Sequence, residues 1–185
     1  MSFLGRWRAE RVLQRRAGSF VDVLLRDPQP DDVDWLSQVA TRGDVDHARW
    51  ELRYARRALG LLAAQRDALD DRTASLVAHT LAGAFGRDPN IAPDALELAE
   101  RQFNARLSAY RDALAARAGA QVSARLGQTV LAFSGGSFRD ADQHVKRGGA
   151  LLGSYLTEAN SALREIFGIA RLPDDVAPSA IAASR

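Results

Sequence analysis

Three short interruptions divide this chain into long segments, and they constrain its fold more than any other feature. Residues 26–32 contain two prolines and three aspartates, residues 86–93 contain two more prolines, and residues 134–137 read Ser-Gly-Gly-Ser. Proline lacks a backbone N–H and clashes with the preceding helical turn, so a helix does not run through the first two stretches. The interruptions therefore predict four long segments joined by short connections.

The segments between the interruptions show the periodicity of helices. Apolar residues recur at steps of three and four, which places them on one helix face, and no sustained alternation of apolar and polar residues indicates a strand. One such row is Leu96, Ala99, Phe103, Leu107, Tyr110 and Leu114, and another is Leu152, Tyr155, Leu156, Ala159, Leu163, Ile166 and Phe167. We expect helices at about 3–26, 33–41, 44–86, 92–134 and 138–167.

Local signals refine these boundaries. The helix expected at 44–86 has a possible break at Asp70-Asp71, where an aspartate would cap a new helix. Gly119 predicts a kink or break in the helix at 92–134, and Gly168 is suited to the position just after the last helix.

Four long amphipathic helices joined by short turns predict an all-α fold, an antiparallel four-helix bundle with a short extra helix after the first. A chain of 185 residues is long enough to bury its own core as one domain, which we place at residues 1–168. Residues 169–185 contain two prolines and no apolar face, so we expect a flexible tail there.

Composition removes several classes of function. Cysteine is absent, which excludes disulfides, thiolate zinc sites and cysteine nucleophiles. No apolar run approaches the roughly 20 residues of a membrane-spanning helix, and the N-terminal stretch lacks the apolar core of a signal peptide. We therefore expect a cytoplasmic protein. The net charge of +2 does not by itself indicate a nucleic-acid partner.

The most specific polar cluster is Asp44, His47 and Glu51, whose spacing places them on the helix face that carries Trp50 and Tyr54. One interpretation is a metal or haem site completed by His144 from across the bundle, although no second Glu-x-x-His pair is present. The other is structural: Asp44 caps the helix, His47 lies in its first turn and Glu51 pairs locally. The second interpretation implies no cofactor.

Arginine supplies two further candidate surfaces. Arg49, Arg53 and Arg56 share the helix face opposite the expected core, where they would bind phosphates or an acidic partner, or form an ordinary solvated face. Residues 1–16 hold five arginines against one acid, Glu10, together with Trp7. A helix lying on a membrane surface is disfavoured, because Arg11 projects beside Trp7 on the helical wheel. We expect a packed helix whose first turns are mobile or engage a partner, in the second case through Trp7, Arg8, Arg11 and Arg15.

No catalytic signature is present: the chain lacks a phosphate-binding GxxxxGK[ST] loop, a GxSxG elbow and an HExxH zinc motif. This favours a non-catalytic interaction or assembly protein that docks a protein partner, or a second copy of itself, through exposed helix faces and its basic N-terminus. The alternatives are a nucleic-acid-binding module that uses the arginine stripes, and a metal or haem protein built on His47, Glu51 and His144.

Overall fold

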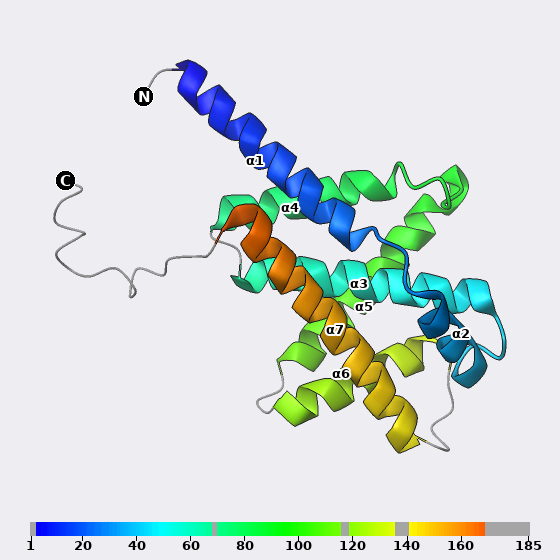
Figure 1. The fold of residues 1–185 in the computed structure, drawn as a ribbon. Helices are drawn as coiled ribbons and strands as arrows, with labels where there is room; N and C mark the ends of the chain where they lie inside the picture. Colours follow the sequence, from blue (N-terminus) through cyan, green and yellow to red (C-terminus); the bar gives the residue numbers. More distant parts are fainter. Residues whose placement is uncertain (1–2, 68–69, 116–118, 136–140, 169–185) are drawn as a thin grey trace.

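The computed structural model of the chain describes residues 3–67, 70–115, 119–135 and 141–168. Within these ranges the backbone forms seven α-helices, one 3-10 turn and no strand, which confirms the all-α prediction (Figure 1). The finer arrangement as an antiparallel four-helix bundle is not confirmed. The elements are α1 (Phe3–Leu24), α2 (Pro30–Val39), α3 (Val45–Asp67), α4 (Asp71–Phe85), η1 (Pro93–Ala95), α5 (Leu96–Leu114), α6 (Gly119–Phe133) and α7 (Ala141–Phe167).

Several of the expected boundaries are found at the residues that signalled them. Asp70 caps α4, because its side chain accepts a hydrogen bond of 2.7 Å from the Thr73 N–H. Gly119 begins α6, so the stretch expected as one helix at 92–134 contains two. Gly168 follows α7 with a φ of +91°, a conformation that favours glycine. The tail expected at 169–185 lies outside the described residues.

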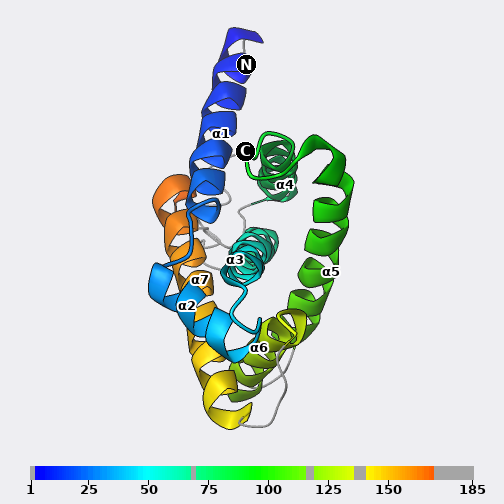
Figure 2. The ribbon, with the colours of Figure 1, turned by 90° about the vertical axis from the view of Figure 1, so that its right-hand side faces the viewer.

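Helix α3 occupies the centre of the fold. It packs against all six other α-helices, and Figure 2 looks along its axis with the others placed around it. Every residue from 51 to 64 is buried, so this helix has no solvent face over four turns. A helix buried on all sides is normally apolar all round. Here it carries four charged residues, Glu51, Arg53, Arg56 and Arg57.

Small residues allow the surrounding helices to approach closely. Gly60 on α3 faces the Leu24 side chain of α1, and a Cβ at position 60 would overlap that leucine. Between α6 and α7 a Cβ on Gly127 would overlap the Val145 carbonyl, and one on Gly149 would overlap Ser123. Among the described helices none is long and apolar enough to cross a membrane.

Candidate functional site

The N-terminal half of α1 extends past the rest of the fold in both views of the ribbon (Figures 1 and 2). Its outer side carries Arg8, Arg11 and Arg15, which are exposed and separated by three and four residues, so they share one helix face. Trp7 and Val12 flank them with exposed fractions of 48% and 40%. We call these five residues the α1 basic face.

The opposite side of α1 fixes the helix to the body. Ala17, Phe20, Val21 and Leu24 are buried, and the Phe20 ring meets the Phe167 ring of α7 edge-on with centroids 6.3 Å apart. Nearer the N-terminus, Glu10 forms an ion pair with Arg72 at the start of α4. The α1 basic face is therefore carried on a helix whose C-terminal half belongs to the core.

The arginines of the α1 basic face have no carboxylate partner within the described part of the chain. The Arg11 guanidinium lies 3.8 Å from the centre of the Trp7 ring, a cation–π contact that holds both side chains on the same surface. Arg15 donates a hydrogen bond of 3.4 Å to the Arg11 carbonyl within the helix. The face thus offers unpaired positive charge beside exposed apolar area.

The arginines Arg49, Arg53 and Arg56 of α3 do not form an exposed surface of this kind. The prediction that they lie on a helix face outside the core is wrong for Arg53 and Arg56. Arg53 and Arg56 are only 9% and 7% exposed. Arg53 pairs with Asp27 in the α1–α2 connection at 2.7 Å, and Arg56 pairs with Glu158 of α7 at 2.9 Å. Periodicity could not reveal this, because α3 is covered on every side and an amphipathic pattern assumes one solvent face. Arg49 is half-buried near Asp46, with their charged atoms 3.7 Å apart.

Arg57, the neighbour of the stripe, is the most deeply buried arginine of α3. Its Nη2 donates to Asp88 at 2.8 Å, and the guanidinium lies 4.9 Å from the Phe85 ring centre and 5.7 Å from that of Trp50. Burial acts to raise the pKa of Asp88, but hydrogen bonds from Arg57 and Asn90 outweigh it and hold this pKa below its usual value.

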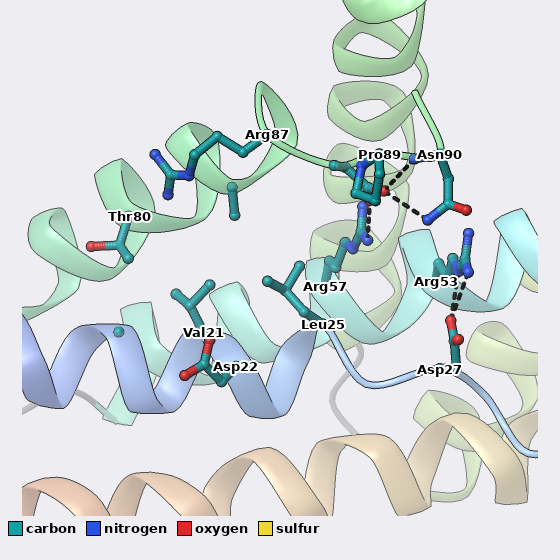
Figure 3. A pocket seen from close by; sticks show the side chains of 13 residues that line it. Val21, Asp22, Leu25, Asp27, Arg53, Arg57, Thr80, Arg87, Pro89 and Asn90 are labelled. Carbon is teal, nitrogen blue, oxygen red and sulfur yellow. Dashed lines mark hydrogen bonds and ion pairs between the residues drawn. The ribbon is translucent and has the colours of Figure 1, made fainter. Parts of the chain in front are cut away.

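A cavity of about 450 Å³ lies between α1, α4 and the loop after α4, and its floor is formed by Arg53 and Arg57 (Figure 3). The view shows Arg53 directed to Asp27 and Arg57 directed to the loop that carries Pro89 and Asn90. Three arginines and three aspartates line this cavity, so its ionised groups balance. The charges on its floor are already paired and hold the connections to α3.

The Asp44, His47 and Glu51 cluster is built largely as the structural interpretation predicts. Asp44 Oδ1 accepts a hydrogen bond of 2.9 Å from the His47 N–H and so caps α3. His47 Nε2 lies 3.3 Å from Glu51 Oε1, one turn along the helix. Within the described ranges no three His, Asp or Glu side chains gather so as to hold a metal ion, so His144 on α7 does not complete such a group.

Arg106 on α5 is the partner that the sequence analysis missed. Its Nε donates to Glu51 Oε2 at 2.7 Å, and its Nη2 donates to Glu51 Oε1. The signal was present: Ala99, Phe103, Tyr110 and Ala113 are buried at steps of four and three, and Arg106 occupies the middle of that row. A charged residue at a core position requires a buried counter-charge, which Glu51 supplies.

Glu51 and Arg106 also line a second cavity, of about 390 Å³, next to the first. Trp50 and Tyr54 form an aromatic wall on α3, with ring centroids 5.4 Å apart. The Tyr54 hydroxyl donates to Gln102 Oε1 at 3.1 Å, and burial raises the pKa of Tyr54, so its phenol stays neutral. We call this space the histidine cavity, because His47 lies at its edge.

Comparison with known proteins adds no assignment to this geometry. No family model matches the chain, and neither curated proteins nor solved structures give a match.

Proposed function

We propose that this protein is a non-catalytic cytoplasmic adaptor that docks an acidic protein surface through the α1 basic face. The observation that carries the proposal is the contrast between the arginines of α1 and α3. The central arginines of α3 are buried and paired, whereas Arg8, Arg11 and Arg15 are exposed and have no carboxylate partner in the described structure.

The chemistry of this face suits a protein partner. A guanidinium matches a carboxylate with two parallel hydrogen bonds, so three of them on one helix face select a surface rich in Asp and Glu. Trp7 and Val12 add apolar area beside the charges, and a tryptophan next to arginines is typical of the residues that contribute most to protein interfaces. Phosphates alone would leave that apolar area without a complement, which favours a protein over a nucleic acid.

The other arginines named from the sequence do not contribute to this surface. Arg53 and Arg56 are buried and paired, so a nucleic-acid interface across α3 would first have to break two ion pairs. A nucleic-acid partner would therefore have to use the same face of α1. Cross-linking from this face distinguishes a protein partner from a nucleic acid.

Site-specific photo-cross-linking tests the proposal. A photoreactive amino acid replaces Val12 in the cells that make the protein, and a matched chain carries it at Ser161, an exposed residue of α7. We expect a discrete protein adduct from position 12 and none from position 161, with an acidic surface on the captured partner. An adduct of two copies of this chain would make the partner a second copy. Adducts to nucleic acid, or equal labelling from both positions, would refute the proposal.

A further inference from the structure

The histidine cavity has the size and the walls of a small-molecule site. Its volume of about 390 Å³ is within the range of pockets that enclose ligands, roughly 300–1,000 Å³. Its lining comes from the start of α3, from the loop before η1 and from α5. These are the elements next to the His47–Glu51 pair, a polar pair that the proposed docking function does not use.

The floor of the cavity is charged but balanced. Glu51 is 2% exposed and Arg106 is 8% exposed, and the two contacts between them leave one positive and one negative charge in balance. The third guanidinium nitrogen of Arg106 also forms a hydrogen bond, because Nη1 donates to the Gln102 carbonyl at 3.0 Å. A ligand that carried its own full charge would enter without a free counter-charge on this floor, which is unfavourable. The floor therefore selects an uncharged molecule.

The aromatic walls of the cavity favour a flat ligand. The Trp50 and Tyr54 rings continue through Phe85 to Phe103, with successive centroids 6.4 and 5.0 Å apart, so the aromatic wall is supported by a row of packed rings. Leu98 stands at the edge with 48% exposure and supplies aliphatic area. The Tyr54 ring is already covered, because Phe85 is stacked against it and the Arg106 guanidinium lies 5.0 Å from its centre. Arg53 lies 5.0 Å from the centre of the Trp50 ring but does not line this cavity, so Trp50 is the ring on which a planar ligand can stack.

Two polar side chains that line this space have hydrogen-bonding groups left over after their contacts within the described structure. The Gln102 side-chain amide accepts from Tyr54, and its N–H groups have no acceptor among the described residues. The Asn90 side-chain amide donates to Asp88 at 2.9 Å, which leaves its carbonyl oxygen as an acceptor. The cavity thus offers a donor and an acceptor beside an aromatic wall, an arrangement that matches the edge of a heteroaromatic ring.

We propose that the histidine cavity binds a small, planar, uncharged heteroaromatic molecule that stacks on Trp50 beside Tyr54 and forms hydrogen bonds with Gln102 and Asn90. Nicotinamide is a suitable probe, because nicotinate has the same ring and differs in carrying a negative charge. Binding is measured by Trp fluorescence in the Trp7→Phe protein, which lacks the exposed tryptophan, and by calorimetry on the unmodified chain. We expect saturable quenching with a Kd of about 1 mM or tighter, and binding of nicotinate at least about tenfold weaker.

Two variants locate the site. Gln102→Leu removes the donor at an exposed position and is expected to weaken nicotinamide binding about tenfold, whereas Gln65→Leu, an exposed control on α3, leaves it unchanged. Ala95→Leu adds bulk to the cavity lining and should abolish binding. The proposal is overturned if nicotinamide fails to bind, if nicotinate binds equally well, or if Ala95→Leu and Gln102→Leu, shown by thermal melting to be folded, bind as the unmodified chain does.

Discussion

Glu51 on α3 and Arg106 on α5, 55 positions apart in the chain, form a buried ion pair in which Arg106 Nε lies 2.7 Å from Glu51 Oε2. The pair is one of four that join α3 to different surrounding segments, the others being Arg53 with Asp27, Arg56 with Glu158 and Arg57 with Asp88. Breaking one side of a buried pair is costly, because the remaining charge is left without a partner. These pairs fix which segment lies on which side of the central helix.

Glu51→Gln is expected to lower the free energy of unfolding by about 3–5 kcal/mol, since Arg106 keeps its charge in a buried position. The matched control is Glu97→Gln, which breaks the exposed pair with Arg101 and should cost at most about 0.5 kcal/mol. Urea denaturation of both variants measures the difference. A double variant with leucine at 51 and 106 should recover most of the loss, and equal effects of the two single glutamine variants would contradict the assignment.

Asp88→Asn should destabilise the protein by about 1–3 kcal/mol, because the Asp88 carboxylate is buried against Arg57. Asp27→Asn should cost less than Asp88→Asn, because the Asp27 side chain is 69% exposed and water can take its place beside Arg53. The lowered pKa of Asp88 means that its contribution is present above the unfolded-state pKa of about 4 and is lost as the pH falls below it. Acid titration of stability should therefore be shallower in Asp88→Asn than in the unmodified chain.

Tyr155→Phe tests the opposite end of the pH range. Burial raises the pKa of Tyr155 to about 12 against the lowering effect of Arg56, and the buried hydroxyl has no hydrogen-bond partner in the described structure. Removing it should change stability by less than about 0.5 kcal/mol at neutral pH, because no bond is lost. Above the unfolded pKa of about 10 only the unfolded state ionises, so the unmodified chain loses stability and the variant should be about 1 kcal/mol more stable near pH 11. Denaturant titrations at both pH values measure this, and identical alkaline profiles would contradict it.

Two glycines of α7 should respond to alanine with opposite signs. Gly149→Ala forces a methyl group into the Ser123 backbone of α6 and should cost about 1–3 kcal/mol or more. Gly153→Ala, one turn later, places its methyl group in open space and should stabilise the helix by about 0.5–1 kcal/mol. Thermal melting of the two variants provides the comparison, and stabilisation by both would mean that α6 and α7 are farther apart than described.

The helical content was predictable because it rests on local signals. The Asp70 carboxylate caps the start of α4, and Gly168 follows α7 at a positive φ that suits a residue without a Cβ. The apolar rows of α5 and α7 are buried or half-buried. The central position of α3 was not predictable in the same way. The spacing of its arginines predicted a solvent-exposed face. The acids that neutralise them lie 26 to 102 positions away in the chain, and periodicity within one sequence carries no information about such pairs.

Among the candidate site residues, too, the local interactions were predictable from the sequence and the long-range ones were not. Asp44 and His47 interact within one helical turn, so their roles as cap and neighbour of Glu51 could be inferred from spacing. The histidine cavity is formed by α3 together with α5 and the loop before η1. The spacing of residues within α3 does not predict which segments lie beside it, so the cavity was not predictable from the sequence. The buried ion pair of Arg106 was predictable in part, because a charged residue in the middle of an apolar row requires a buried counter-charge.

Charge reversal on the α1 basic face tests the central claim most directly. Arg8, Arg11 and Arg15 are changed together to glutamate, and the control changes three exposed arginines elsewhere, Arg66, Arg111 and Arg125. Each chain carries the photoreactive residue at position 12, and both thermal melting and adduct yield are measured. We predict a melting temperature close to that of the parent for the α1 variant, with the position-12 adduct lost there and kept in the control. An adduct that survives reversal of the α1 arginines, or disappears equally in both variants, would contradict the claim.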